Sequence, residues 1–509
     1  MLAFWRNPEF VRHARAELRP VRLATAGALA VIVPLLIGTA VYGNTRAYNQ
    51  EFWSTLFKVL LGMQATVLTL WATLAGMQSV ASERQQRTYD FVRTTSMSSA
   101  ELLVGRLFGV AVLGWVQLIL TMIIAIPAAL LGGFSFGRVV LVYMVLVSLV
   151  ILFTLAALAV SAAMDKPNPG VGMLLLFLLW ILSSMITLVG ASFPGIAALS
   201  PIAAMQSAMG AGSQSGLGYE LERATIFSRA VPLVACTLLL YWTLSAWLVA
   251  ILLRILKSDV DDARPFSRIM AVGFVVYVNA IMLAFYNPSP TTPWRWNPPR
   301  ATNALDLVTV MVALNLFLLY FVGVATVEPA ERLRVWWRKH TANVLQEMQW
   351  PWITAAAVGA FVLLVAELLP MRGTKGFENP PLATAALNLA VALAFAVRDT
   401  MFVQWCRLTR MKSATAKAVA YLGLYYVSVG IVIANVFGRQ SEPLYVAVNL
   451  LTPYRLFYHG MDASVLWSAY AGIAIQIVAA FLLWTAIRGR LEHQTRLIVE
   501  ARPVGTISA

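Results

Sequence analysis

About a dozen apolar stretches, most of them near 20 residues long, run through this sequence. A helix needs about 20 mostly apolar residues to cross a bilayer. The predicted spans are 21–42, 54–79, 107–131, 139–163, 171–192, 230–253, 269–286, 303–327, 351–369, 381–397, 418–437 and 465–487. The sequence therefore predicts an all-α integral membrane protein with about 12 transmembrane helices.

Composition points the same way. The 509 residues are 60% hydrophobic and 12% charged, whereas a soluble domain is about 45–50% apolar and about 25% charged. No long stretch has the mixed composition that an enclosed soluble domain requires. In a soluble protein the net charge of +15 would suggest nucleic acid. In a membrane protein it is typical of basic loops that set orientation, so no nucleic-acid partner is expected.

The distribution of basic residues predicts the orientation. With the N-terminus inside, most of the 38 Lys and Arg residues fall in segments on the inner side. This bias is typical of cytoplasmic loops and predicts that both termini are cytoplasmic. The first apolar run is a full span, so we interpret it as a retained helix and not as a cleaved signal. Residues 4–12 before it mix aromatic and basic side chains, which favours an amphipathic helix at the inner interface.

The segment 82–106 between the second and third predicted spans is the most informative stretch. It indicates a charged helix that leaves the membrane, a polar break at 94–98, and a new helix. Ser98 followed by Glu101 fits a capping box. A helix, a break and a second helix at the inner surface would present a polar projection to the cytoplasm. The alternative is an ordinary solvated loop helix.

The order of residues in this segment resembles the permease subunits of ABC-2 type ATP-binding-cassette transporters. Those subunits show a Glu, then Gly-Thr, an apolar pair, Thr-Pro, an apolar residue and Ser, then Gly-Lys. Here Glu83, Thr88, Ser98 and Gly105 match, whereas Arg87, Ser96 and Arg106 stand where Gly, Pro and Lys are usual. The resemblance implies that the segment is a coupling helix that docks on a separate ATPase, with the N-terminal amphipathic helix contributing to the contact.

A faint internal repeat extends this interpretation. Residues 95–109 match residues 409–423 at Thr95/Thr409, Met97/Met411, Ser99/Ser413, Ala100/Ala414 and Gly109/Gly423. We therefore expect two ABC-2 permease-like halves, a six-span half at 1–255 and a four-span half at 328–509, joined by a hairpin at 256–327. Each half would offer one coupling segment, 82–106 and 398–417, to one of two ATPase subunits. The expected coupling residues are Glu83, Arg84, Arg87, Thr88, Tyr89, Asp90, Thr95 and Ser98, with Arg407, Arg410 and Lys412 in the second half.

Several kinds of chemistry have no sequence support. The chain contains no Gly-x-x-x-x-Gly-Lys-Ser/Thr loop, so ATP would be bound by a partner subunit. The four histidines and two cysteines lack the spacing of a metal site, and no cofactor or catalytic motif is predicted. Among acidic residues, Asp306, Glu367 and Asp399 are expected near span ends, in snorkelling or capping roles. The spacing of Gly105 and Gly109 suits close helix packing.

The leading hypothesis is a permease subunit of an ABC exporter in the cell membrane, in a bacterium the inner membrane. An ion-coupled secondary transporter is one alternative, but it would need two complete six-span halves and deep acidic residues. A membrane-embedded transferase for lipid-linked substrates is another, and it would need paired acidic residues in the outer loops. An accessory or sensor subunit with the same fold is a third. The transported substrate is not predicted.

Overall fold

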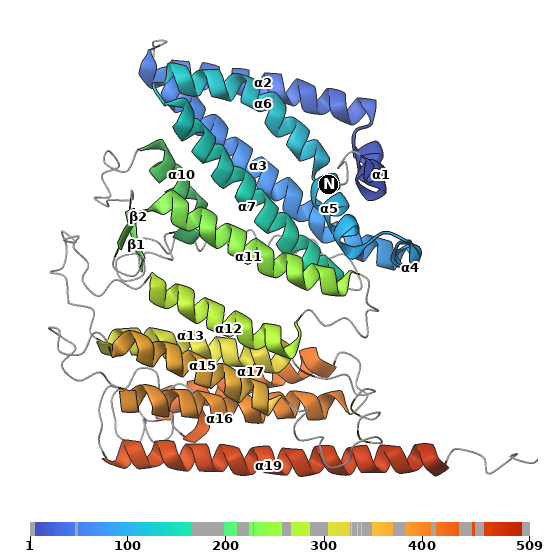
Figure 1. Cartoon of the computed structure of the whole chain (residues 1–509), viewed down its shortest axis with the longest axis vertical. Coiled ribbons are helices and arrows are strands. Elements are labelled where there is room, and N and C mark those ends of the chain that lie inside the picture. The colour runs from blue at the N-terminus through green and yellow to red at the C-terminus, as the bar shows by residue number, and fades with distance from the viewer. Residues whose placement is uncertain are drawn as a thin grey trace, which may run out of the picture. The chain divides into compact units, whose positions relative to one another are not determined.

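The computed structural model describes residues 6–45, 49–163, 198–210, 223–226, 229–256, 266–285, 304–325, 327, 333, 337, 349–369, 382–408, 414–436, 450–452 and 463–500. By contacts the chain divides into two compact units. The first comprises residues 1–265 and 285–294, and the second comprises residues 266–284 and 295–509. Long helices dominate both (Figure 1). This confirms the all-α class, to which the described residues add one short antiparallel hairpin in the first unit.

The elements of the first unit are, in order, α1 (Pro8–Glu17), α2 (Pro20–Thr45), α3 (Gln50–Gln85), α4 (Tyr89–Thr94), α5 (Ser99–Gly109), α6 (Val112–Leu131), α7 (Phe136–Ala163), α10 (Pro201–Met209), β1 (Arg223–Ile226), β2 (Arg229–Pro232) and α11 (Leu233–Ile255). Helix α3 lies at the centre, with α2, α6 and α7 packed against it, and α11 packs against α7. Gly76 allows the close approach of α3 and α7, because a Cβ at this position would lie 2.9 Å from Cβ of Ala157.

The third predicted span is interrupted. We expected one helix from 107 to 131, but the structure has a break at Val110 and Ala111 that separates α5 from α6. Helix α5 belongs with α1, against which it packs, and α6 begins the membrane-spanning part. The apolar run alone does not reveal this break, because both helices are apolar on the side that faces the bundle.

The second unit contains α12 (Arg268–Ala284), α13 (Ala304–Ala325), α15 (Trp350–Leu368), α16 (Leu382–Arg407), α17 (Ala414–Val436) and α19 (Ala463–Glu500). Helix α16 packs against α13, α15, α17 and α19. Buried amides join its helices: Asn279 and Asn315 exchange two hydrogen bonds of 2.9 and 2.7 Å. Such pairs stabilise helix contacts in lipid because the amides have no water to bond with.

Seven described helices are long and apolar enough to cross a membrane: α2, α3, α6, α7, α11, α16 and α19. Shorter apolar helices lie at Arg268–Ala284, Leu314–Ala325, Trp350–Ala366 and Ala420–Val429. These helices account for every predicted span except 171–192, which lies outside the described residues. The count of twelve and the cytoplasmic termini stay predictions.

The position of Asp399 corrects an expectation. We predicted a span ending at 397 with Asp399 at its inner end, but α16 continues to Arg407, so Asp399 lies about 12 Å before the end of the helix. Its carboxylate is buried and accepts hydrogen bonds from Tyr320, Tyr426 and Arg398. Arg398 also donates to Gln476 of α19. The pair is internally neutralised and links four helices, which indicates a structural role. The side chains of Asp306 and Glu367 lie outside the described residues.

Candidate functional site

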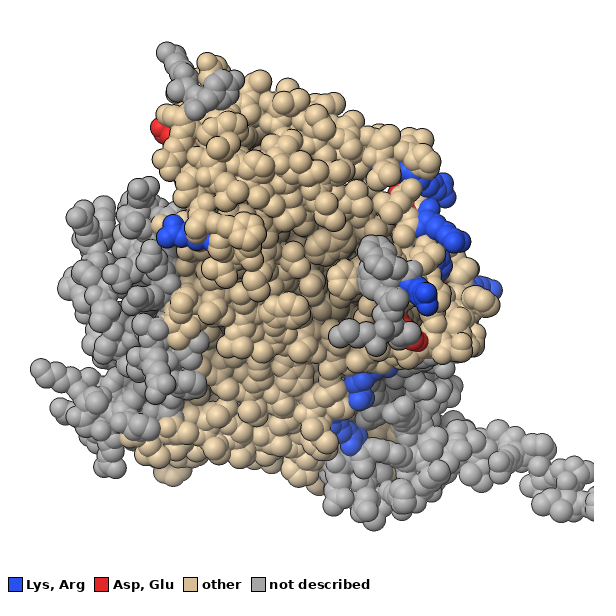
Figure 2. Space-filling view, turned by 45° about the horizontal axis from the view of Figure 1, so that its top comes forward, with Lys and Arg blue, Asp and Glu red and all other residues tan. Residues whose placement is uncertain are grey.

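The site forms at one end of the first unit, where α1, α4 and α5 meet the last turn of α3. We call this the basic end, because Arg and Lys side chains gather on that side of the face shown in Figure 2. A broad surface without charged side chains separates it from the opposite end (Figure 2). This is the pattern expected of a membrane-spanning surface with one strongly basic margin.

Helix α1 begins at a cap that also ties it to α5. The Asn7 side chain accepts hydrogen bonds from the backbone N–H groups of Glu9 and Phe10, and Pro8 occupies the first helical position. Both features favour a helix start. The Asn7 amide then donates to the carbonyl of Glu101 at 2.7 Å. The predicted amphipathic helix is therefore present, and its first turn is bonded to the helix that follows α4.

Close packing of α1 on α5 depends on Gly105 and Gly109. A Cβ at Gly105 would lie 2.5 Å from Oδ1 of Asn7 and 2.7 Å from Cβ of Glu9. A Cβ at Gly109 would lie 2.9 Å from Cβ of His13. The predicted role of this glycine pair in helix packing is thus confirmed, and its partner is the N-terminal helix.

Helix α3 ends in a turn that explains part of the sequence motif. The N–H of Arg87 bonds to the carbonyl of Arg84, and the N–H of Thr88 bonds to the carbonyl of Glu83. These two bonds form a Schellman motif, whose residue after the C-cap adopts the left-handed conformation that favours glycine. Arg87 has φ of 57°. The glycine usual at this position in ABC-2 permeases is therefore the residue that this turn prefers.

Helix α5 starts with the predicted capping box. The N–H of Glu101 donates to the Ser98 hydroxyl at 3.2 Å, and the Glu101 carboxylate accepts from the N–H of Ser98 at 2.8 Å. Thr95, at the end of α4, donates from its hydroxyl to the carbonyl of Val92. The chain between α4 and α5 is thus fixed by local bonds, and α4 projects as a short, defined helix.

Four charged side chains form the centre of the site, and we call them the Arg106 cluster: Glu9, Arg12, Glu83 and Arg106. Arg106 has no exposed surface. Its Nε donates to Glu9 Oε1 at 2.9 Å, and its Nη2 donates to Glu83 Oε2 at 2.5 Å. Arg12 pairs with the same two carboxylates from the solvent side. Two guanidinium groups therefore neutralise two carboxylates and join α1, α3 and α5.

The electrostatics of Glu9 reflect this arrangement. Burial alone would raise the pKa of Glu9, but the hydrogen bond from His13 and the charges of Arg106 and Arg12 outweigh it and lower the pKa to about 2. Burial likewise opposes the charged form of Arg12, yet the two carboxylates raise its pKa. Both residues therefore stay ionised at neutral pH.

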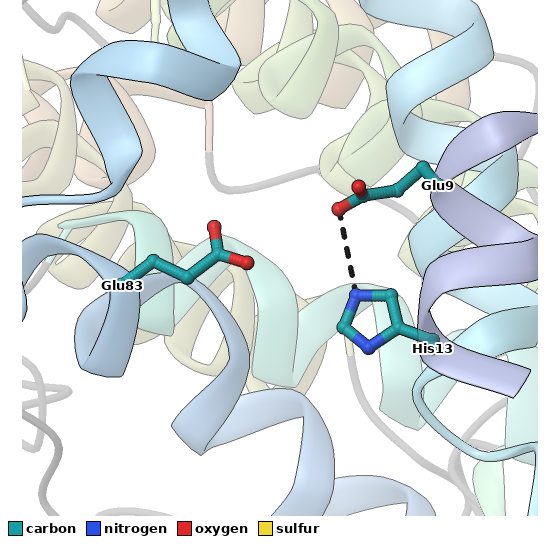
Figure 3. Close-up of side chains that lie close together, drawn as sticks. All are labelled: Glu9, His13 and Glu83. Carbon is teal, nitrogen blue, oxygen red and sulfur yellow. Dashed lines mark ion pairs between the residues drawn. The ribbon is translucent and has the colours of Figure 1, made fainter. Parts of the chain in front are cut away.

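Glu9, His13 and Glu83 come close enough to be considered as metal ligands, with ligand atoms within 4.8 Å of one another (Figure 3). In Figure 3, His13 approaches Glu9 from the same helix while Glu83 points toward them from α3. However, Arg106 and Arg12 already pair with Oε1 of Glu9 and with both oxygens of Glu83. A cation would have to displace both guanidinium groups, so we interpret the group as part of an ion-pair network.

Tyr89 connects α4 to the rest of the unit. Its ring is buried and lies 4.9 Å from the guanidinium of Arg84 and 5.7 Å from that of Arg106. Its hydroxyl donates to the carbonyl of Leu256, directly after α11. Burial raises the pKa of Tyr89, despite the opposing effect of the two arginines. The side chain therefore stays neutral and holds α4 against the end of α11.

The predicted coupling residues divide into two groups. Glu83 and Tyr89 are buried in the contacts just described, and Arg84 is half-buried and donates to the carbonyl of Ala162. Among the other predicted residues, Arg87, Thr88, Asp90 and Ser98 are exposed and Thr95 is half-buried. Phe91 and Thr94, which were not among the predicted residues, are exposed as well. Phe91 is 77% exposed. We call Arg87, Asp90, Phe91 and Thr94 the α4 face.

The second predicted coupling segment, 398–417, is different. Residues up to Arg407 continue α16, and α17 begins at Ala414. Arg407 donates to the carbonyl of Val327 at 3.3 Å. Arg410 and Lys412 lie outside the described residues. Gly423, the repeat counterpart of Gly109, has open space beside it, so the helix contact made by Gly109 is not repeated there.

Sequence reasoning also missed Asn7, Glu9 and Arg12 as members of the site. One available signal was Arg106 itself, a charged residue within the apolar run that leads into the third span. A buried charge requires a partner. The segment 6–22 has only two acidic residues, Glu9 and Glu17, but the sequence gives no register between α1 and α5 with which to choose between them.

Comparison with known proteins finds one family for part of the chain. Residues 35–211 match the model of the ABC-2 family transporter protein. This part of the chain is similar to ABC-2 family transporters. The matched region contains α4, α5 and Arg106 and ends just after α10, and together with the long apolar helices it supports a multi-pass membrane permease of an ABC transporter. ABC-2 permeases are transport subunits without an ATPase of their own, and they associate with an ABC ATPase. No curated protein and no solved structure matches the chain.

Proposed function

We propose that the chain is the membrane-spanning subunit of an exporter and that a separate ATPase docks on the α4 face. The observation that carries this proposal is the exposure of Phe91 on a short helix outside the predicted spans. Burying an aromatic side chain yields about 1.5–3 kcal/mol, so an exposed phenylalanine in a firm polar projection suits a protein partner. Aromatic side chains are also enriched among the residues that dominate binding energy at interfaces.

The contacts behind the α4 face supply a mechanical connection. Tyr89 links α4 to the end of α11, and the Schellman turn links it to α3. The Arg106 cluster then links α3 to α5 and α1. Packed elements held by ion pairs move as rigid bodies more readily than they deform. Closure of an ATPase dimer against α4 would therefore displace α1, α3, α5 and α11 together.

The number of ATPase subunits, the direction of transport and the membrane that holds the protein can also be proposed. We propose two ATPase copies per chain, with the second docking at the junction of α16 and α17. We also propose export as the direction of transport and the bacterial inner membrane as the location. The internal repeat supports the second docking segment, and the basic inner segments support the membrane location.

The direct test is co-purification of the chain with its co-expressed ABC ATPase subunit from membranes. Phe91→Ser should reduce the retained ATPase at least tenfold, because a buried aromatic contact of about 2 kcal/mol corresponds to more than a tenfold change in affinity. Phe136→Ser is the matched control, since Phe136 is 65% exposed at the opposite end of the first unit. Retention of the ATPase by Phe91→Ser at the level of the control would overturn the docking assignment.

A further inference from the structure

A groove of about 940 Å³ opens between α2, α3 and α6, outside the Arg106 cluster. Most of its lining is apolar, with Val33 on α2 and Val67 and Trp71 on α3. The polar groups at its far end are already paired: Gln64 donates to Thr121 at 2.8 Å and accepts from Tyr143 at 3.1 Å. An apolar chain can therefore lie over this end without leaving a polar group unsatisfied.

The depth of the groove matches one leaflet of a bilayer. On α2 its lining extends from Arg22 to Val33, and on α3 it extends from Met63 to Ala75, with Gln78 about one turn further toward the basic end. The two rises are about 16 and 18 Å along a helix. The hydrocarbon core of a bilayer is about 30 Å thick, so one leaflet is about 15 Å deep. The helix proline Pro34 follows directly after the last lining residue of α2. Beyond it, Ile37 and Val41 pack into the core of the unit, where the groove no longer continues.

The mouth of the groove is at the basic end. Arg22 lines it and donates one hydrogen bond to Glu17 at 2.7 Å, which uses one of the five N–H donors of a guanidinium group. Arg15 and Arg19 precede Arg22 by a few residues in the sequence, and both are exposed. The segment 6–22 carries five arginines against two glutamates. Basic side chains beside a membrane attract anionic headgroups.

We propose that this groove is a binding site for an anionic phospholipid of the leaflet at the basic end. One acyl chain lies along α3 between α2 and α6, and the phosphate is bound by Arg22. The proposal combines the depth of the groove, its apolar lining and the charge at its mouth. It does not depend on the ATPase partner, because it rests only on the first unit and the adjacent bilayer.

The test uses the full chain purified in detergent after exchange into mixed phosphatidylglycerol and phosphatidylcholine, with bound lipid measured by mass spectrometry. Wild type should retain phosphatidylglycerol over phosphatidylcholine. Val67→Trp fills the groove and should lower the retained phosphatidylglycerol several-fold. Val59→Trp is its control, because Val59 and Val67 lie on α3 with similar exposure, 42% and 45%, and only Val67 lines the groove.

A second pair of variants, one test and one control, tests the contact with the lipid headgroup. Arg22→Gln should abolish the preference for phosphatidylglycerol, whereas Arg19→Gln, outside the lining, should leave it intact. Equal retention of both lipids by wild type would show that bulk acyl chains fill the groove and would overturn the proposal. A dimer that dissociates in Val67→Trp without any change in bound lipid would assign the groove to a second copy of the chain, which also overturns it.

Discussion

Arg106 on α5 and Glu9 on α1 form a buried ion pair, with Nε of Arg106 2.9 Å from Oε1 of Glu9. The two residues lie far apart in the sequence, on either side of the first two long helices. This contact places the N-terminal helix against the segment that follows α4. It also makes the position of α1 dependent on a charge that α5 supplies.

Removal of Arg106 should destabilise the first unit strongly. Arg106→Met leaves Glu9 and Glu83 buried together, and breaking a buried ion pair from one side costs about 3–5 kcal/mol. We expect a large fall in the thermal unfolding temperature in detergent and faster proteolysis within α1. The control is Arg15→Gln, because Arg15 is an exposed arginine on α1. It should change neither the unfolding temperature nor the proteolysis. A wild-type unfolding temperature for Arg106→Met would show that the cluster contributes no stability.

Acid should weaken the same contact. The pKa of Glu9 is lowered from 4.5 to about 2 in the folded protein, so its stabilising effect is complete above about pH 4.5. The effect is lost as the pH falls from 4.5 toward 2, and it amounts to at most about 3 kcal/mol. The difference in unfolding temperature between wild type and Glu9→Gln should therefore shrink over this range. A difference that stays constant between pH 6 and pH 3 would contradict the ionised state of Glu9.

The turn after α3 should prefer glycine. Arg87 adopts a positive φ, which costs an L-residue roughly 1–2 kcal/mol and glycine almost nothing. Arg87→Gly should therefore raise the free energy of unfolding by up to about 1 kcal/mol, whereas Arg87→Val, with a β-branched side chain, should lower it. Thermal unfolding of the three proteins should rank glycine above arginine and arginine above valine. The reverse order for glycine and valine would exclude strain at this turn.

Packing of α1 on α5 should be sensitive to a single methyl group. In Gly105→Ala the new Cβ would meet Asn7 and Glu9 at distances that require α1 to shift, and such overpacking costs about 1–3 kcal/mol. Gly62→Ala on α3 meets nothing within 4 Å, and it should stabilise its helix slightly because alanine is the better helix former. The two variants should shift the unfolding temperature in opposite directions; equal shifts would mean that α1 does not rest on Gly105.

In the second unit, Asp399 should stabilise the fold by neutralising Arg398. Asp399→Ala leaves the Arg398 guanidinium without its carboxylate, with an expected cost of about 3–5 kcal/mol. The double variant Arg398→Met, Asp399→Ala removes both charges and should recover part of that loss. A double-mutant cycle on unfolding in detergent measures the coupling. Strict additivity of the two changes would show that the pair does not interact.

Three features follow from the amino-acid sequence alone: the helical membrane class, the ABC-2 resemblance that the match over residues 35–211 confirms, and the capping box at Ser98. Hydrophobic length and local hydrogen bonding carry these features, and both are readable within a short stretch of chain. The break between α5 and α6 was not predicted, because apolar residues continue through it. The continuation of α16 past Arg398 was missed for a related reason, since its charges are neutralised inside the bundle.

Which coupling residues are buried and which are exposed depends on tertiary packing. Ser98 and Glu101 bond within one helix turn, so their roles follow from spacing. Tyr89 is buried because Leu256 lies beside it, and Arg106 is buried because Glu9 reaches it from α1. These partners come from distant parts of the chain, and the packing that joins them depends on register and close approach at Gly105. The same packing leaves Phe91 exposed on the α4 face, where a partner protein could contact it.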